Sequence, residues 1–100
     1  MAERRERGDI LSPEFKVAAE IYKYTEVRGE KIWFTKLAKS LEGEMSQSTV
    51  MKSLRRLFDW GIVKAEFGET DKGRAGRLLY IAGESKDVIG KIYDNFWKDK

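Results

Sequence analysis

Residues 45–63, with the sequence MSQSTVMKSLRRLFDWGIV, contain a helix start, an amphipathic run and a helix stop in direct succession. Ser46 is a hydroxyl residue of the kind that caps helix N-termini. From 47 to 59, apolar residues recur at helical spacing and the other positions are mostly polar or cationic. Gly61 stands where a left-handed residue ends a helix, and β-branched residues follow at once. The segment therefore predicts a short surface helix that leads directly into a strand.

The predicted helix 47–59 has two unlike faces. The apolar face consists of residues within about 80° of Val50 on a helical wheel, namely Val50, Leu54, Leu57 and Phe58. The opposite face carries Ser48, Lys52, Arg55, Arg56 and Asp59. We expect the first set to be buried and the second to face outward. Such a helix is roughly 20 Å long, and polar side chains and free backbone N–H groups lie at its start, where they can meet anionic groups.

The part of the chain before this segment predicts two helices and one strand. Ser12-Pro13-Glu14 is a helix start, with a hydroxyl cap, a proline at the first helical position and an acid near the positive end of the helix dipole. Residues 31–34 are β-branched and aromatic, which is typical of a small strand. Thr35 is expected to cap a second helix over 36–41.

The part after this segment predicts a hairpin and a last helix. Two strands, 62–67 and 77–82, are joined by a tip over 68–76 that contains three glycines and several charges. Ser85 begins the last helix. The predicted order is helix, strand, helix, helix, strand, strand, helix, in one domain of 100 residues.

The sequence contains neither cysteine nor histidine, which removes several kinds of site. Disulfides, thiol nucleophiles, Ser-His-Asp triads and the usual zinc or iron ligands all need one of these residues. We therefore expect no enzyme activity, no metal and no cofactor.

Charge and hydropathy indicate which partners and which cellular compartment are compatible with the sequence. The formal net charge of +3 and the pI near 9.2 are compatible with a polyanionic partner without requiring one. No apolar run approaches the roughly 20 residues of a membrane span, and the charged N-terminus MAERRERGD lacks the apolar core of a secretory signal. We expect a cytoplasmic protein without a membrane partner.

The element order, with a tight turn between the second and third helices, resembles the winged helix-turn-helix superfamily of DNA-binding domains. The resemblance spans residues 12–82. Its most specific part is 46–50, Leu54, Leu57 and 61–63, which resembles the recognition helix of the arsenic-repressor and multiple-antibiotic-resistance types of prokaryotic transcriptional regulator. The resemblance implies an α+β fold with a three-helix core, a small antiparallel sheet with a wing hairpin, and a C-terminal helix.

This resemblance divides the chain into three parts. Residues 1–9 are expected to be a flexible tail, residues 10–83 a winged-helix DNA-binding domain, and residues 84–100 a C-terminal helix that is a candidate dimerisation element. The implied function is sequence-specific binding of double-stranded DNA by a transcriptional regulator, with helix 47–59 in the major groove and hairpin 68–77 as the wing.

Nine residues are expected to contact DNA under this hypothesis. They are Gln47, Ser48, Thr49, Lys52, Arg55, Arg56, Lys72, Arg74 and Arg77. Each cation also fits an ordinary solvated surface, and phosphate would repel Glu69 and Asp71 in the hairpin. The alternative function is therefore a winged-helix protein–protein interaction module in a larger assembly, without direct DNA contact.

Six large apolar residues occur between 88 and 97 in the last predicted helix, in two rows. One row is Val88, Ile92 and Phe96, and the other is Ile89, Tyr93 and Trp97. One row would cover the core, and the second would meet another chain, because so many exposed aromatic residues in a small domain mark an interface. We expect a homodimer, with Ile89, Tyr93, Phe96 and Trp97 at the interface. The alternative is that both rows pack on the first helix of a monomer.

Overall fold

The computed structural model describes residues 11–70 and 73–99, and the predicted tail at 1–9 lies outside them. Three helices come first along the chain: α1 (Pro13–Tyr22), α2 (Phe34–Ser40) and α3 (Gln47–Trp60). A hairpin of two strands, β1 (Val63–Glu69) and β2 (Ala75–Ile81), follows. The chain then passes through a 3₁₀ turn, Gly83–Ser85, into α4 (Lys86–Ile92). The element order predicted from the sequence is confirmed except for the first short strand.

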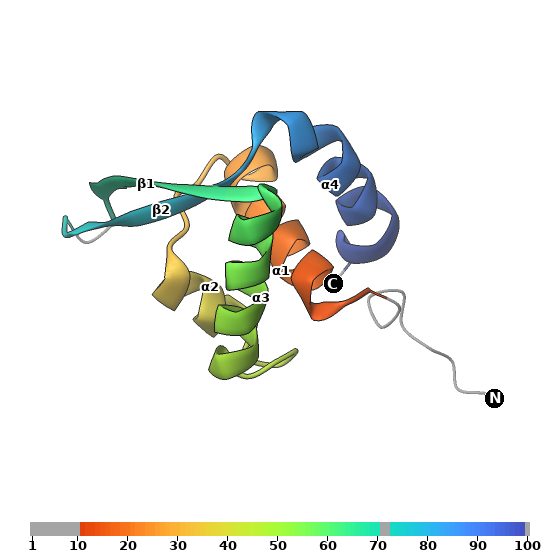
Figure 1. The fold of residues 1–100 in the computed structure, drawn as a ribbon, viewed down its shortest axis with the longest axis horizontal. Helices are drawn as coiled ribbons and strands as arrows, with labels where there is room; N and C mark the ends of the chain where they lie inside the picture. Colours follow the sequence, from red (N-terminus) through yellow and green to blue (C-terminus); the bar gives the residue numbers. More distant parts are fainter. Residues whose placement is uncertain (1–10, 71–72, 100) are drawn as a thin grey trace.

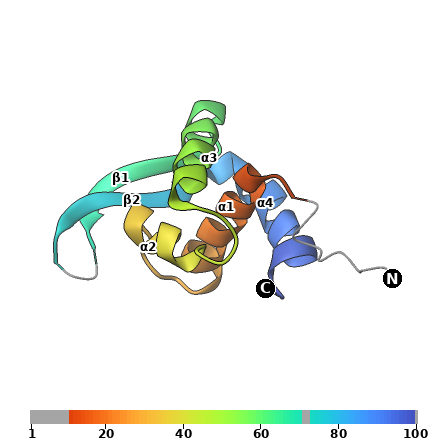
Figure 2. The ribbon, with the colours of Figure 1, turned by 90° about the horizontal axis from the view of Figure 1, so that it is seen from below.

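The helix α1 lies between α3 on one side and α4 on the other (Figures 1 and 2). The hairpin extends away from the helices on the side opposite to α4, and α2 lies below its base in Figure 1. Both α1 and α4 end in a π-helical turn, Lys23–Val27 and Tyr93–Trp97 respectively. The hairpin and α4 are therefore at opposite ends of the molecule.

Local signals account for the bounds of α1 and α3. The Ser12 hydroxyl accepts a hydrogen bond from the Phe15 N–H at 3.3 Å, with Pro13 at the first helical position. The Ser46 hydroxyl accepts from the Thr49 N–H at 3.1 Å, and Gly61 ends α3 with a φ of 77°. These caps and this stop are as the sequence predicted.

The start of α2 differs from the prediction. The helix begins at Phe34, and Trp33 rather than Thr35 is the cap residue, with no side-chain hydrogen bond to the helix. Residues 31–34 do not form the predicted strand. Only the Ile32 carbonyl pairs with the sheet, accepting from the Leu79 N–H at 2.8 Å, because the chain turns into α2 directly afterwards.

The sheet is a two-stranded antiparallel hairpin whose register runs from the pair Val63 and Ile81 to the pair Glu69 and Ala75. Side chains alternate between its faces, so Val63, Leu79 and Ile81 are buried beneath the helices. The predicted apolar face of α3 is also confirmed, since Val50, Leu54 and Leu57 are buried and Phe58 packs half-buried at the edge of the core.

The C-terminal helix belongs to the same core, which corrects the predicted dimer interface. Ile89, Tyr93 and Trp97 are buried within their own chain, and only Phe96 of the four predicted residues is partly exposed. The Tyr93 ring lies 5.5 Å from the Tyr22 ring of α1, measured between centroids. In the other row, Val88 is 58% exposed, whereas Ile92 and Phe96 are half-buried and Ile92 packs against the core.

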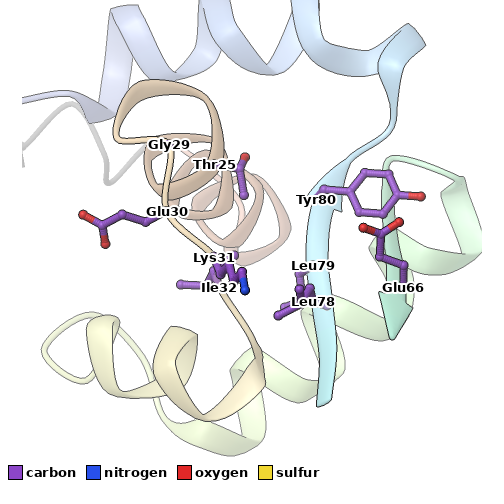
Figure 3. A pocket seen from close by; sticks show the side chains of 9 residues that line it. All are labelled: Thr25, Gly29, Glu30, Lys31, Ile32, Glu66, Leu78, Leu79 and Tyr80. Carbon is purple, nitrogen blue, oxygen red and sulfur yellow. The ribbon is translucent and has the colours of Figure 1, made fainter. Parts of the chain in front are cut away.

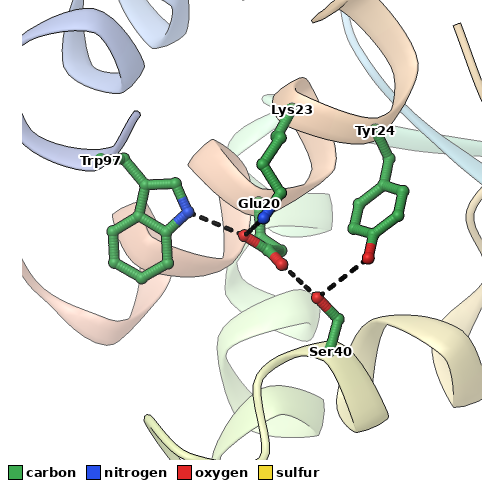
Figure 4. Close-up of polar contacts among 5 residues, drawn as sticks. All are labelled: Glu20, Lys23, Tyr24, Ser40 and Trp97. Atoms are coloured by element: carbon green, nitrogen blue, oxygen red, sulfur yellow. Dashed lines mark hydrogen bonds and ion pairs between the residues drawn. The ribbon is translucent and has the colours of Figure 1, made fainter. Parts of the chain in front are cut away.

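A buried carboxylate connects three helical elements (Figure 4). Glu20 of α1 accepts a hydrogen bond from the Trp97 indole N–H at 2.8 Å and another from the Ser40 hydroxyl at the end of α2. The Lys23 ammonium lies 3.3 Å from the same carboxylate, and the Tyr24 hydroxyl donates to Ser40 at 3.3 Å. Because buried carboxylates are stable only with such partners, this network fixes α2 and the C-terminal turn onto α1.

Candidate nucleic-acid interface

The outward surface of α3 has two sides, and contacts with neighbouring elements identify them. On one side, Arg56 donates to the Glu14 carboxylate at 2.7 Å, and the Trp60 and Phe15 rings lie 6.5 Å apart. On the other side, the Arg77 guanidinium of β2 lies 5.9 Å from the Phe58 ring centroid. One side of α3 therefore faces the start of α1, and the other faces the hairpin.

Helical spacing assigns the remaining residues to these sides. Gln47, Met51, Arg55 and Phe58 follow one another at intervals of four, four and three, so they form one stripe toward the hairpin. We call this stripe the wing side of α3. Thr49 is placed with Arg56 toward α1, because seven residues separate them. Ser48 and Lys52 lie between the two sides.

A hollow of about 710 Å³ lies between α2 and the hairpin. It is lined by Trp33, Phe34, Thr35, Lys36, Lys39, Thr70, Arg74, Ala75, Gly76 and Arg77. Four of these residues are cationic, and the part of the chain that the structure describes contributes no carboxylate to the lining. A concave surface of this composition attracts anions.

A smaller hollow of about 220 Å³ continues this surface to the start of α3. It is lined by Thr35, Ala38, Lys39, Glu42 and Gln47. Because Thr35 and Lys39 line both hollows, the two form one surface from the hairpin across α2 to Gln47. We call this surface the basic trough.

A third hollow of about 420 Å³ has a different character (Figure 3). It lies between the loop that carries Gly29, Glu30 and Lys31 and the strand residues Leu78 to Tyr80, with Glu66 of β1 beside Tyr80. Two carboxylates and one ammonium among its lining side chains do not favour an anionic ligand. The basic trough is therefore the better candidate for a polyanion.

The structure brings some of the nine predicted contact residues together and separates others. Gln47, Arg55, Arg74 and Arg77 belong to the wing side or to the basic trough, and Ser48 and Lys52 are exposed beside them. Thr49 is half-buried, and its hydroxyl lies 3.0 Å from the Ser46 hydroxyl. Lys72 lies outside the described residues.

Arg56 has a role within the fold, because it is paired with a nearly buried carboxylate. Burial raises the pKa of Glu14, but its backbone N–H and the bonds from Arg56 and Ser12 lower it by more, so the pKa is below its ordinary value of 4.5. Glu14 therefore stays ionised at neutral pH and holds Arg56 on the α1 side of α3.

Sequence reasoning missed the contribution of α2. Lys36 and Lys39 stand three residues apart, which places them on one face of that helix, and this spacing was the available signal. The Lys36 ammonium has partners within the chain, because it donates to the Lys31 carbonyl at 2.8 Å and lies 4.9 Å from the Trp33 ring centroid. Lys39 is exposed and is therefore the better placed of the two for an external anion.

Four carboxylates lie on or near this surface. Glu42 lines the trough just after α2. Glu66 and Glu69 are exposed on β1, and Asp59 is exposed near the end of α3. Each would repel a phosphate placed against it. A bound polyanion is therefore expected to place its phosphates against the cations of the trough and the first half of α3, away from these carboxylates.

Residues 11–70 and 73–99 meet the requirements of neither of two further kinds of site. Within these ranges no cluster of three or more acidic residues is arranged to hold a metal ion. No helix in the same ranges has the length and apolar character needed to cross a membrane.

Comparison with known proteins identifies the fold. No protein-family model matches the sequence, and no curated protein matches it either. Among solved structures, the crystal structure of SSV1 F-93 is similar over 85% of this chain and 86% of that chain, with 24% sequence identity and a TM-score of 0.65. The predicted α+β winged-helix fold is confirmed by this likeness, whereas the relation to DNA-binding regulators of any type stays a prediction.

Proposed function

We propose that this chain binds double-stranded DNA in a sequence-specific manner and acts as a transcriptional regulator. The wing side of α3 would enter the major groove, and the β1–β2 hairpin would serve as the wing. The observation that carries this proposal is the continuity of the basic trough with the wing side of α3, because a phosphate backbone can follow such a surface from the hairpin to Gln47.

The dimensions of α3 suit this role. Its 14 residues span about 21 Å at 1.5 Å per residue, and the major groove is about 12 Å wide. Arg55 and Lys52 are exposed along this length and can reach base edges or phosphates. Arg74, Arg77 and Lys39 would contact the backbone and fix the orientation of the protein, since phosphate contacts position while base contacts specify.

The proposal assigns a binding role without catalysis, and neither a cofactor nor a metal takes part. A protein of this kind acts where DNA is accessible, so the proposed compartment is the cytoplasm of a prokaryotic cell. The arsenic-repressor and multiple-antibiotic-resistance types of regulator are the proposed relatives, on the resemblance of the α3 sequence.

We also propose that the protein is a homodimer through the row Val88, Ile92 and Phe96. Val88 is exposed and Ile92 and Phe96 are half-buried along α4 and the π-helical turn that follows it. The helix α4 lies at the end of the molecule away from the hairpin. A two-fold dimer would present two copies of α3 to half-sites roughly 34 Å apart, one turn of DNA.

The alternative function is a protein–protein interaction module without DNA contact. The same apolar row on α4 supports it, as do the exposed Trp60 on α3 and the carboxylates of β1. Under this alternative the partner would bind α4, and the trough would have no ligand.

A salt titration separates the two functions. Binding to fluorescent mixed-sequence and selected duplexes is followed by anisotropy, with the log of the association constant plotted against the log of salt concentration. DNA binding predicts a line with a slope of about −0.9 for each phosphate neutralised. Lys39→Ala should reduce that slope by about one unit, whereas Lys98→Ala, at the far end of the chain, should leave it unchanged. Absence of duplex binding at low salt contradicts the proposal and favours the alternative.

A further inference from the structure

One aromatic side chain on the wing is almost completely exposed. Phe67 of β1 is 84% exposed, more than any other large apolar residue in the described ranges. It stands directly opposite Arg77 in the antiparallel register, so the two side chains lie next to each other on one face of the hairpin.

That face is the one turned toward α3 and the trough. Closer to the helices, the same alternating set of residues supplies the buried Val63, Leu79 and Ile81. Arg77 lines the trough and lies 5.9 Å from the Phe58 ring on the wing side of α3. DNA that contacts α3 and the trough would therefore meet Phe67 as well.

Two paired glycines lie next to Phe67 in the hairpin. Gly68 and Gly76 pair across the strands next to Phe67, with their α-hydrogens on the opposite face. A Cβ at Gly68 would lie 2.6 Å from the Leu78 Cδ1, and one at Gly76 would lie 3.0 Å from the Thr70 Cγ2. The side chains of Leu78 and Thr70 therefore cover the two glycines on the face opposite Phe67.

The surroundings of Phe67 favour DNA over a protein partner. Its neighbours on the same face are Ala65, Arg77 and Glu69, so it does not belong to a broad apolar patch of the kind that protein interfaces bury. The Lys31 ammonium lies 3.0 Å from the Glu69 carbonyl oxygen, which adds a cation to Arg77 and Arg74 at this end of the hairpin. Along β1 the exposed carboxylates of Glu66 and Glu69 lie on either side of Phe67, and the cations are supplied by β2 and by Lys31. A single exposed aromatic ring next to cations is of the kind that enters the minor groove and unstacks a base step.

We infer that Phe67 is a wedge that inserts between base pairs from the minor groove and bends the DNA. The inference rests on the proposed function and extends it to the shape of the bound duplex. Sites with a pyrimidine–purine step under the wing are favoured, because those steps unstack at the lowest cost. Phe67 thus contributes to specificity through deformation, apart from the base contacts of α3.

The test measures the bend directly. A duplex of about 30 base pairs, selected from random sequences by the wild-type protein, carries a donor dye at one end and an acceptor at the other. Saturating wild-type protein should raise the energy transfer. Phe67→Ala should bind through α3 and leave the transfer at the value of free DNA, and Phe67→Trp should restore the bend. Val27→Ala, which also truncates an exposed apolar side chain, should bend as the wild type does.

Three results would overturn the inference, and they differ in what they leave standing. Binding by the wild-type protein with no rise in transfer, or an equal rise with Phe67→Ala, contradicts the wedge and leaves the proposed function standing. Failure of the wild-type protein to bind any duplex overturns the proposed function and the wedge with it. Because Phe67 is so exposed, circular dichroism of Phe67→Ala should match the wild type and exclude misfolding as the cause of a lost bend.

Discussion

Arg55 and Arg56 are neighbours in the sequence, but the fold gives them different surroundings. Arg55 is exposed on the wing side of α3, whereas Arg56 is paired with Glu14 at 2.7 Å on the side toward α1. One residue along a helix changes the direction of a side chain by about 100°. The sequence alone placed both in the DNA-binding set, and the structure separates their roles.

Substitution of Arg55 should therefore mainly weaken DNA binding, whereas substitution of Arg56 should mainly lower the stability of the fold. Arg55→Ala should weaken DNA binding by about 1–3 kcal/mol if it makes a bidentate base contact, with little change in the urea midpoint. Arg56→Ala should lower the free energy of unfolding by roughly 0.2–1 kcal/mol, because its guanidinium is mostly exposed, and it should affect DNA binding less. Anisotropy titrations and urea unfolding of both variants measure the two quantities. Equal loss of DNA binding in the two variants would contradict the division of α3 into sides.

The Glu14 carboxylate should make stability depend on pH. Its pKa is lowered in the folded chain relative to the ordinary value of 4.5, so the unfolded chain takes up the proton first as the pH falls. The contribution of Glu14 to stability is therefore complete above that value and is lost as the pH falls through the lower pKa of the folded state. Urea midpoints from pH 7 to pH 3 should show Glu14→Gln less stable than the wild type at neutral pH, with the difference shrinking below pH 4.5. If the urea midpoints of the two proteins differ by the same amount at every pH in this range, the lowered pKa of Glu14 is not what makes the wild type more stable.

At the scale of elements, the buried Glu20 network makes the C-terminal turn part of the domain. Trp97→Phe keeps most of the ring but removes the donor to Glu20, which leaves a buried carboxylate with one partner fewer. We expect a loss of about 1–3 kcal/mol in the free energy of unfolding, measured by urea denaturation. Phe96→Leu, at the half-buried neighbouring position, serves as the control and should cost less. An unaltered midpoint in Trp97→Phe would mean that the C-terminal turn does not stabilise the domain.

Elements specified by local signals could be predicted from the sequence, and those that depend on tertiary pairing could not. The caps at Ser12 and Ser46 and the stop at Gly61 each act within one turn, so α1 and α3 were predicted closely. Residues 31–34 have strand propensity, yet only Ile32 finds a partner in β2 before α2 begins. Strand propensity describes a fit to a neighbouring strand and not a property of the segment alone.

The packing of the C-terminal helix could not be predicted from the sequence for a similar reason. Its two apolar rows are visible in the sequence, but the row that is buried depends on the direction from which α4 meets α1. Gly90 offered a clue, since a Cβ there would lie 2.8 Å from the Tyr22 hydroxyl oxygen, and this close approach is on the side of Ile89 and Tyr93. The basic trough was missed for a related reason, because α2 and the hairpin are separated in sequence and meet only in the fold.

At the scale of the whole molecule, the proposed homodimer depends on the row Val88, Ile92 and Phe96. Val88→Glu places a charge at the exposed start of that row, and we expect it to convert a dimer into a monomer because an unpaired buried charge is costly. Sedimentation at micromolar concentration measures the mass of both forms. The mass of one chain for the wild type would reject the dimer, and the substitution should leave the urea midpoint nearly unchanged because Val88 is exposed in the single chain.

The central claim is that one continuous surface, made by the wing side of α3, the basic trough and the hairpin, receives DNA. Titration of the isotopically labelled protein with a selected duplex, followed through its backbone amide resonances, tests this most directly. The account predicts the largest shifts at Gln47, Arg55, Lys39, Phe67 and Arg77, with α4 unchanged at a fixed oligomeric state. Shifts concentrated on α4 and on the Glu14 side of α1, with the trough unmoved, would contradict it.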